Sequence, residues 1–505
     1  MIGSSWWRIV LVAAGCATLG FSAQRRAVNW GDLGDGRYRN PILKSDYSDP
    51  DVIRAGDDFY LVASDFHFMG IQVLHSKDLV NWSIIGQVFH RLPIAPKYDE
   101  MAAYAEGTWA PALRYHGGEF YLYVCTPYDG LFMWHTKDPA ALWTGPVTVK
   151  AVSGWEDPCP FWDDDGKAYL IHSRKGAGPL ILHRMSADGT KLLDEGITVY
   201  VGPTAEGPKL FKRDGFYYIS HPEGGVGPGW QAVERSHDLY GPYEHKVVFS
   251  GGIHQGAIVD TPGGESWFIA FKSTGWLGRI CYLEPVTWDD DAWPVFGDHG
   301  KPVDVWKKPA VTAKPAPSRP ETSDEFNGPA LNPIWQWNHN PVDEAWSLKS
   351  RAGFLRLAAL PAEDPAHAHN TLTEKLWDEA GAIDTKIDAA GLADQQRAGL
   401  AFLSGPQFSW VAIEKAGTGC RIVWPGGAGV PVPSCGAVWF RGTYRQDQAA
   451  LAYSTDGKKW NETGQKIVLK FASWKGARFG VFTYGPTRGF ADVDYVRYEY
   501  GAEGR

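Results

Sequence analysis

The stretch YSDPDVIRAGDDFYLVAS, residues 47–64, places two acids around a proline directly before a run of aromatic and β-branched residues. A run of this kind, led by a turn, is typical of a buried strand. Burying an ionised carboxylate is costly unless the group is paired or has a function, so Asp49 and Asp51 need an explanation. Whether the pattern recurs along the chain decides between a local turn and a functional site.

Five segments share this design, a turn containing Gly or Asp followed by a strand-like run. They read DDFYLVAS, GGEFYLYVCT, DDGKAYLIHS, RDGFYYISH and GGESWFIAFKS. Aligned on Tyr60, Tyr121, Tyr169, Tyr217 and Phe268, they lie 61, 48, 48 and 51 residues apart. A period of about 50 residues accommodates four short strands and is typical of a propeller blade. The sequence therefore predicts a five-bladed β-propeller over residues 36–305.

Beyond the repeats, a proline-rich stretch over residues 306–321 predicts an extended linker. Residues 322–505 then contain strand-like runs at irregular spacing, such as FLRLAAL, AGLAFLS and RFGVFTYG. This unevenness argues against further blades and predicts an antiparallel β-sandwich of jelly-roll, concanavalin-like type. The predicted fold class is all-β, with few helices.

Charge and the N-terminal segment limit the partners and the location. The 58 acids and 49 bases give a net charge of -9 without a long run of one sign, which argues against a nucleic acid or an anionic membrane as the partner. Residues 1–23 carry one Arg and an apolar stretch too short to span a bilayer, which predicts a signal peptide. We therefore expect export to the periplasm or the exterior, with lipid anchoring at Cys16 as the weaker alternative. Cys420 and Cys435 could form a disulfide there, but spacing alone leaves this open.

The residues that open each repeat are candidates for one shared site. Asp49, Trp109, Asp157 and Glu206 stand 11 or 12 residues before the aligned aromatic of their repeats, and His254 stands 14 before its own. The first strand of every propeller blade lines the central axis, so these side chains should converge. Like charges gathered at an axis cost energy, which predicts a catalytic or ligand-binding cluster.

Two carboxyl groups across a pocket with aromatic walls are what glycosidic cleavage needs. One protonates the leaving oxygen, and the other activates water or attacks the sugar. A third carboxylate can raise the pKa of the acid and orient it. The rings of Phe66 and Trp109 offer apolar faces to a sugar. We expect an oligosaccharide or polysaccharide substrate and no cofactor for catalysis.

At this point the residues resemble glycoside hydrolase family 43. The segments NPILKSDYSDPDVIR, GTWAPALRY, EDPCPFWDDDGKAYL, AEGPKLFKRDGFYYI and LGRICYLEPVTW carry the resemblance, in order, across residues 40–300. The downstream part looks like the sandwich of the xylosidase-like branch. The resemblance implies an exo-acting, inverting hydrolase that releases a terminal pentose, β-D-xylose from xylo-oligosaccharides or xylan before other substrates.

Three other functions are compatible with parts of this pattern. An α-L-arabinofuranosidase acting on arabinoxylan or arabinan stays open, because the two sugars present similar hydroxyls. A catalytically inactive carbohydrate-binding propeller is the alternative outside enzymes. An invertase-like propeller is disfavoured, because YSDPDVIRAG does not match the WxNDPNG segment of that group.

The resemblance also implies roles for individual residues. Asp49 would be the general base on water, Glu206 the general acid, and Asp157 the carboxylate that tunes and positions Glu206. Arg279 matches an arginine that contacts substrate hydroxyls and the catalytic carboxylates.

The remaining matches concern binding and support. Phe66 and Trp109 match wall residues of the subsite for the terminal sugar. His254 matches a histidine near the axis that is associated with a bound ion or water, so substrate contact, a metal site such as Ca²⁺ and a purely structural role all stay open. Asp51 is expected to lie behind the site and to support it.

Overall fold

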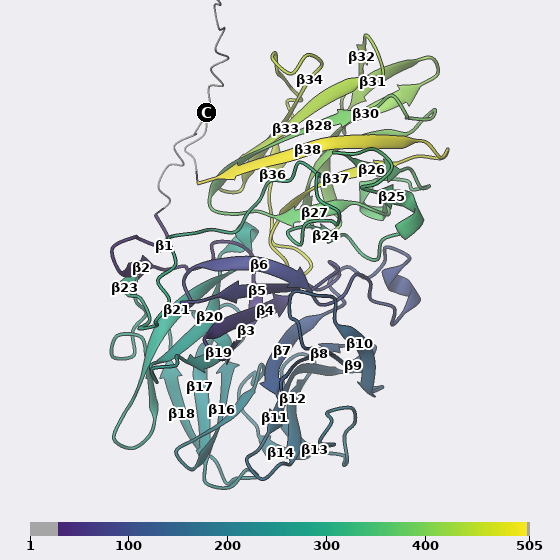
Figure 1. Ribbon diagram of the computed structural model, residues 1–505. Coiled ribbons are helices and arrows are strands. Elements are labelled where there is room, and N and C mark those ends of the chain that lie inside the picture. The colour runs from purple at the N-terminus through teal and green to yellow at the C-terminus, as the bar shows by residue number, and fades with distance from the viewer. Residues whose placement is uncertain (1–28, 502–505) are drawn as a thin grey trace, which may run out of the picture.

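The computed structural model describes residues 29–501 (Figure 1). The predicted signal peptide over residues 1–23, with Cys16, lies outside the described residues. Nearly all regular structure between residues 29 and 501 is β, and the helical turns are the short 3₁₀ segments η1 (Pro96–Tyr98), η2 (Gly275–Leu277), η3 (Asp343–Ala345) and η4 (Pro365–His367). No helix in this part of the chain is long and apolar enough to cross a membrane. The predicted class, a five-bladed propeller followed by a β-sandwich, is confirmed.

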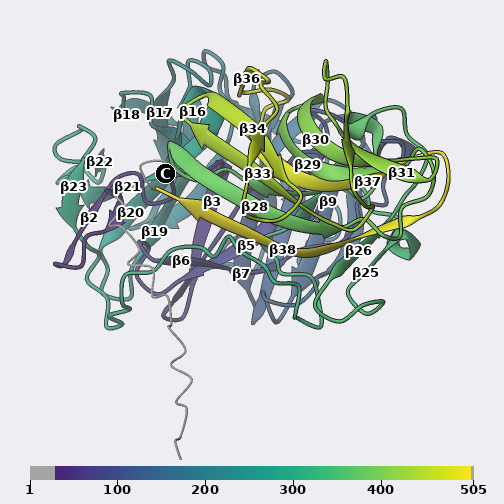
Figure 2. The same cartoon turned by 90° about the horizontal axis from the view of Figure 1, so that it is seen from above.

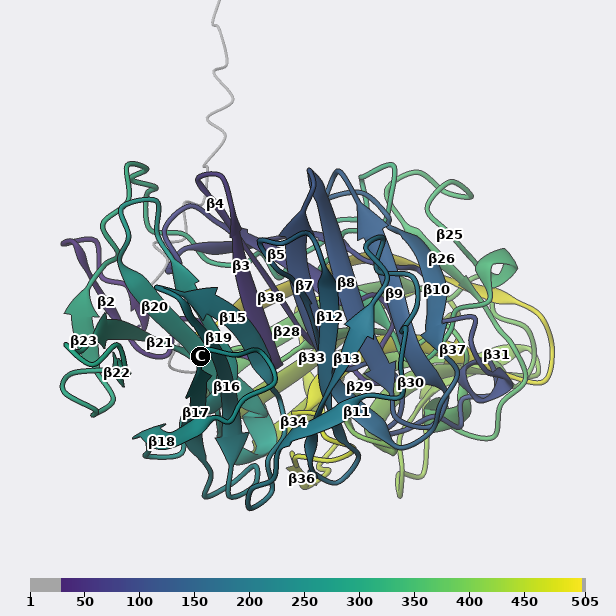
Figure 3. The same ribbon diagram turned by 90° about the horizontal axis from the view of Figure 1, so that it is seen from below.

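Each blade is a four-stranded antiparallel sheet built from consecutive strands, and Figure 3 shows the blades from the side away from the sandwich. The blades are β3 (Ser48–Ala55), β4 (Asp58–Ser64), β5 (Gln72–Ser76) and β6 (Trp82–Gln87); β7 (Trp109–His116), β8 (Glu119–Thr126), β9 (Gly130–Thr136) and β10 (Thr144–Lys150); β11 (Trp155–Trp162), β12 (Ala168–Arg174), β13 (Leu180–Met185) and β14 (Ile197–Tyr200); β15 (Lys209–Arg213), β16 (Phe216–Glu223), β17 (Trp230–Ser236) and β18 (Glu244–Phe249); β19 (His254–Asp260), β20 (Ser266–Ser273), β21 (Arg279–Trp288) and β22 (Pro294–Phe296).

Tight turns explain why the first two strands of a blade pair so closely. Gly117 and Gly118 both have positive φ, and so do Asp214 and Gly215. Positive φ at both central residues is the geometry of a two-residue hairpin turn whose twist matches the flanking strands, and Asp-Gly and Gly-Gly adopt it readily. The turn residues that revealed the repeat are therefore the residues that fold it.

At or near the start of the innermost strand of every blade stands a residue in the left-handed region. Where this residue lies inside a strand, the ladder to the second strand shifts register by a β-bulge. A bulge re-aims the side chains beside it and is common next to active sites. The residues, with φ of 52°, 35°, 56°, 55° and 54°, are Asp49, Ala110, Asp157, Gly207 and Gln255.

A small sheet joins the chain before the first blade to the chain after the last. It contains β1 (Gly31–Asp32), β2 (Arg37–Arg39) and β23 (Val305–Lys307), with Arg37 paired to Lys307. The proline-rich segment that follows packs on blade 1, where Lys308 forms ion pairs of 2.6 and 2.7 Å with Asp32 and Asp78. The linker is therefore held against the propeller.

Two stacked sheets form the sandwich, which lies over one face of the propeller (Figures 1 and 2). The first sheet contains, in order of pairing, β24 (Gln336–Trp337), β27 (Leu372–Lys375), β37 (Arg478–Tyr484), β29 (Arg397–Ser404), β30 (Gln407–Ala416), β31 (Gly419–Val423) and β32 (Val430–Val432). The second contains β25 (Trp346–Ser347), β26 (Leu355–Ala358), β38 (Phe490–Tyr500), β28 (Ala380–Asp388), β33 (Ala437–Arg445), β34 (Gln448–Ser454) and β35 (Asn461–Glu462), with β36 (Ile467–Val468) also paired to β34. Cys420 and Cys435 form a disulfide, which settles the pairing that spacing left open.

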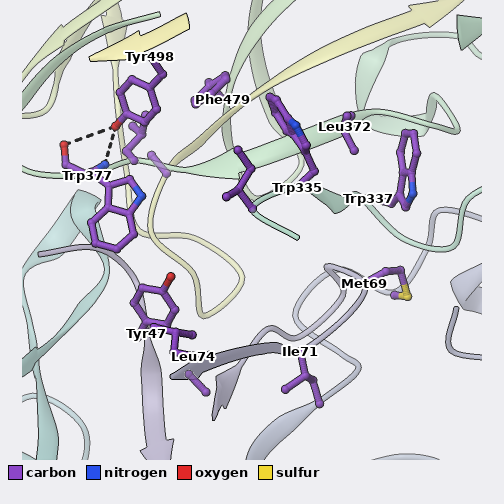
Figure 4. Close-up of a cluster of buried hydrophobic side chains, with 14 of the residues drawn as sticks. Tyr47, Met69, Ile71, Leu74, Trp335, Trp337, Leu372, Trp377, Phe479 and Tyr498 are labelled. Atoms are coloured by element: carbon purple, nitrogen blue, oxygen red, sulfur yellow. Dashed lines mark hydrogen bonds between the residues drawn. The ribbon is translucent and has the colours of Figure 1, made fainter. Parts of the chain in front are cut away.

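The propeller and the sandwich share one continuous apolar core. Figure 4 shows Tyr47, Met69, Ile71 and Leu74 of the first blade facing a row of sandwich side chains that includes Trp335. Burying large aromatic side chains contributes a large share of the energy of such an interface. The two parts therefore pack as one body, with the start of blade 1 at their junction.

Candidate active site

The predicted carboxylates meet at the face of the propeller that the sandwich covers. Carboxylate oxygens of Asp157, Glu206 and the neighbouring Glu156 lie within 4.8 Å of one another. The charge of Asp49 raises the pKa of both Asp157 and Glu206, so Asp49 belongs to the same cluster. The structure thus brings Asp49, Asp157 and Glu206 together, although they come from three different blades.

Asp49 is held by donors on both carboxylate oxygens. Its Oδ1 accepts a hydrogen bond of 2.9 Å from Nη1 of Arg279, and its Oδ2 accepts one of 2.6 Å from the hydroxyl of Ser64. The Ser64 hydroxyl in turn accepts from the backbone N–H of Ala110 at 2.6 Å, which fixes its direction. Charge-assisted bonds of this kind are short and directional. Asp49 is therefore held in one orientation toward the cluster.

Glu206 has the opposite electrostatic environment. Burial raises its pKa, the charges of Glu156 and Asp49 raise it further, and Arg279 opposes them, with a result of about 8. A carboxyl group with this pKa carries a proton at neutral pH and can donate it. The site therefore places a carboxylic acid that is protonated at neutral pH near a carboxyl group held by a guanidinium and a hydroxyl.

Asp157 acts on the acid mainly through the backbone. Its Oδ2 accepts a hydrogen bond of 2.8 Å from the N–H of Gly207, the residue after Glu206. Burial and the surrounding carboxylates raise the pKa of Asp157 well above its usual value, which favours the uncharged form. Asp157 thus positions the strand entrance that carries Glu206.

Glu156 is a fourth carboxylate that the sequence analysis did not single out. It is buried, and it accepts hydrogen bonds from the backbone N–H groups of Gly176 and Ala177 at 3.1 and 2.9 Å. Of the neighbouring charges, Glu156 has the largest effect on the pKa of Glu206. Side chains alternate along a regular strand, so Glu156 and Asp157 should face opposite sides, but the bulge between them and Cys159 places both in the site.

Aromatic side chains from both parts of the molecule line the cluster. The rings of Phe66 and Trp109 meet edge to face with centroids 5.6 Å apart, and their role as walls of a sugar subsite stays a prediction. The ring of Trp474, from the sandwich, lies 6.2 Å from that of Trp109. The guanidinium of Arg279 lies 5.7 Å from the ring centroids of both Phe471 and Trp474. The sandwich therefore completes a wall that the propeller sequence alone did not indicate.

His254 is buried beside Arg279 and Asp49. Its Nδ1 faces the carbonyl of Gly252 at 3.3 Å, and its Nε2 has no hydrogen-bond partner among the described residues. Burial lowers the pKa of His254 to about 4, so the ring is neutral at neutral pH. A neutral ring with a free nitrogen suits contact with a sugar hydroxyl, and this role stays a prediction.

The group that could hold a metal ion in the described part of the chain is Glu156, Asp157 and Glu206, and His254 is not in it. A bound cation would lower the pKa of all three carboxyl groups. That effect opposes the protonated state of Glu206 that burial and Glu156 favour. The residues therefore fit a proton-sharing cluster better than a resident metal, and the calcium ion stays a prediction.

Asp51 lies behind the site, as expected. It is fully buried and its Oδ2 accepts hydrogen bonds from the N–H of Leu113 at 2.7 Å and from Arg114 at 2.8 Å, with Lys209 at 3.6 Å. These contacts tie the innermost strands of three blades together below the cluster. The second acid of the opening stretch thus has a structural function.

Comparison with known proteins identifies the family. Residues 38–294 match the model of glycosyl hydrolases family 43, and residues 323–499 match the concanavalin A-like C-terminal domain of β-xylosidases. The chain belongs to glycosyl hydrolase family 43. The family and the type of sandwich predicted from the sequence are confirmed.

Family 43 relatives resemble the chain over almost its whole length. It is 46% identical over 473 residues to a provisionally named β-xylosidase of Xylanibacter ruminicola, covering 90% of this chain and 88% of that protein. It is 35% identical to a β-xylosidase of Formosa agariphila, covering 95% and 93%. The crystal structure of a xylan β-1,4-xylosidase from Bacillus halodurans superposes with a TM-score of 0.81 at 25% identity, covering 91% of this chain and 99% of the other.

Removing the charge of Glu156 should change the pH dependence of the acid. In Glu156→Gln the pKa of Glu206 falls, because the negative charge that raised it is gone. The alkaline limb of kcat/KM, where the acid loses its proton, should move to lower pH by roughly one unit. The pH profile of kcat/KM on a glycoside with a poor leaving group measures this shift.

Glu284→Gln is the matched control. Burial also raises the pKa of Glu284 to about 8, but this group bonds the N–H of Val303 at 2.9 Å and the side chain of Asn40 at 3.3 Å, away from the cluster. The alkaline limb of kcat/KM in Glu284→Gln should stay at the pH found for the parent protein. A shift of the alkaline limb of kcat/KM in Glu284→Gln but not in Glu156→Gln would contradict the role assigned to Glu156.

Proposed function

We propose that the protein is an exo-acting β-xylosidase that hydrolyses terminal xylose from xylo-oligosaccharides or xylan with inversion. One observation carries the chemistry, namely Asp49 held by Arg279 and Ser64 in the same cluster as Glu206, whose pKa is raised to about 8. The names of the full-length relatives support xylose as the sugar.

In the proposed mechanism Asp49 accepts a proton from a water molecule while the water oxygen attacks the anomeric carbon. Glu206 gives its proton to the glycosidic oxygen as that bond breaks. Arg279 holds Asp49 in place at 2.9 Å and lowers the pKa of Glu206, which limits how far burial can raise it. Arg279 therefore acts on both the proposed base and the proposed acid.

The exo mode is supported by the sandwich residues beside Trp109 and Arg279. Phe471 and Trp474 remain 36% and 40% exposed, so parts of both rings are free to contact a ligand. Their position beside Trp109 and Arg279 closes one side of what a propeller alone would leave as a groove. A site closed on one side would admit a chain end and exclude an internal segment.

We also propose that the protein acts outside the cytoplasm. The Cys420–Cys435 disulfide supports this, because disulfides persist in oxidising compartments. Fractionation of cells that produce the full chain should find it in the exported fraction without residues 1–23. Intact chain confined to the cytoplasm would count against the proposal.

The roles of the two carboxyl groups predict different losses. Asp49→Asn should lower kcat by about 10²–10⁴-fold on every substrate, because each turnover needs an activated water. Glu206→Gln should cause a comparable loss on xylobiose and a much smaller one on nitrophenyl β-xyloside, whose leaving group departs without a proton. Steady-state kinetics on both substrates measures the difference, and equal losses in the two variants on both substrates would refute the roles.

The anomeric form of the first product gives a second readout of the same roles. With water activated by Asp49, β-linked xylobiose should release α-xylose first, as followed by NMR before mutarotation. Release of β-xylose would reject Asp49 as a base on water.

The choice of sugar is tested with a pair of nitrophenyl glycosides. We expect kcat/KM on the β-xyloside to exceed that on the α-L-arabinofuranoside. The reverse order would make the arabinofuranosidase alternative the better description. No turnover of either, by a folded protein, would favour a binding protein.

A further inference from the structure

The sandwich reaches the catalytic cluster through a turn of unusual composition. The turn Ala472–Lys475 lies between β36 and β37, and its end residues exchange backbone hydrogen bonds of 3.0 and 3.1 Å. Its central residues Ser473 and Trp474 have φ of 53° and 62°. Asn and Gly are the usual residues for this geometry, and other side chains there cost about 1–3 kcal/mol each. Surrounding contacts must therefore hold the turn in place.

Lys475 provides those contacts. Its side chain is 1% exposed although it carries a charge. Nζ donates a hydrogen bond of 2.8 Å to the backbone carbonyl of Ser64 and forms an ion pair of 2.8 Å with Asp46. Asp65 lies 3.8 Å away. A cation from the sandwich is thus buried among the residues that open blade 1.

Both partners of Asp49 connect to this one ammonium group. Ser64, which donates to Oδ2 of Asp49, is held through its carbonyl. Arg279, which donates to Oδ1, is held through Asp46, because Oδ1 of Asp46 accepts from the backbone N–H of Arg279 at 2.9 Å.

The other oxygen of Asp46 accepts from the N–H of Gly476 at 3.1 Å, next to Lys475. Gly278 precedes Arg279, and a Cβ on it would come within 2.3 Å of Asp46, so the fit there leaves no room for adjustment. A shift of the turn would therefore be transmitted to Arg279 as well as to Ser64.

We propose that Lys475 is a positioning residue for the base, which makes the sandwich part of the catalytic machinery. The hydrogen bond and ion pairs of Lys475 go to Ser64, Asp46 and Asp65 and not to Asp49, Asp157 or Glu206, and the active-site ring it approaches is that of Phe66, at 5.7 Å. Lys475 fixes the two donors that orient Asp49, and this inference rests on the proposed role of Asp49 as the base.

Lys475→Met tests the inference, because it keeps the length of the side chain and removes its charge and donors. When Ser64 and Arg279 are displaced, Asp49 should no longer be oriented toward the attacking water. We therefore expect kcat to fall by about 10²-fold with little change in KM. A carboxylate with weaker donors also holds its proton more tightly, so the acidic limb of the pH profile should move to higher pH.

Several other titratable and charged groups surround Lys475 and set the choice of control. Lys475 pairs with Asp46 and Asp65, Lys375 and Arg478 pair with the same Asp65, and His67 and Cys281 lie within range of the Lys475 charge. Lys375→Met is the matched control, because Lys375 is a buried sandwich cation 3.0 Å from the same Asp65. Its hydrogen bonds go to Gln72 and Gln336, not to Ser64 or Asp46. Both variants should unfold at lower temperature, but only Lys475→Met should change kcat and the acidic limb.

Two results would overturn the inference. One is a folded Lys475→Met with the kcat and pH profile of the parent protein, and the other is an equal loss of kcat in Lys375→Met. If Lys475→Met yields no folded protein, Asp46→Asn decides, because it removes the ion pair and preserves the size of the side chain. An unchanged kcat and acidic limb in Asp46→Asn reject the inference, and the shift described above supports it.

The parent protein separates this inference from the proposed function. If the parent protein fails to hydrolyse xylosides with inversion, the proposed function is wrong and the role of Lys475 falls with it. If the parent protein does so and the variants behave as it does, only the role of Lys475 is wrong.

Discussion

A left-handed residue at the entrance of each innermost strand is the constraint on which the site depends. Asp49 and Asp157 occupy this position themselves, and Glu206 and His254 immediately precede it. Non-glycine residues in this conformation cost about 1–3 kcal/mol each, and such strain persists only where the surrounding structure enforces it. Here the strain turns side chains from separate blades toward one another, which regular pleating would not do.

The sequence made the architecture predictable because the blades repeat and their turns are chemically explicit. The recurrence of acids at the same register likewise indicated Asp49, Asp157 and Glu206, while the choice of Arg279 required the resemblance to a family. Glu156 was missed because a bulge is invisible in a pattern that assumes alternation. Its position beside Asp157 in the segment WEDPCPF was the available signal, and it would have mattered only if a bulge had been assumed.

Residues that reach the site from the sandwich could not be predicted for a different reason. Trp474 and Lys475 lie in a turn between strands at irregular spacing, and nothing in SWKGARF specifies which surface that turn meets. Their function depends on how two sheets far apart in sequence pack, and hydrophobic patterning predicts that such sheets are buried without saying against what. The role of Ser64 could not be predicted either, because in the sequence it is only the last residue of a predicted strand.

In the site and in the interface alike, the charges of the neighbouring groups decide in which direction the pKa of a buried acid shifts. Burial alone would raise the pKa of Asp65, but the charges of Lys375, Lys475 and Arg478 hold it well below its usual range. Glu206 is buried with acids nearby instead of bases, and its pKa moves up. Arg279 acts on both carboxyl groups of the site, because it donates a hydrogen bond to Asp49 and its charge lowers the pKa of Glu206.

The small sheet that pairs Arg37 with Lys307 has a consequence for biosynthesis. Every blade is made of consecutive strands, so each can form as soon as it leaves the ribosome, yet the ring has a seam between the first blade and the last. Closing that seam brings together segments at opposite ends of the propeller, a costly loop closure that comes late in synthesis. Until then the nascent chain is an open row of sheets, and the carboxylates have no common centre to surround.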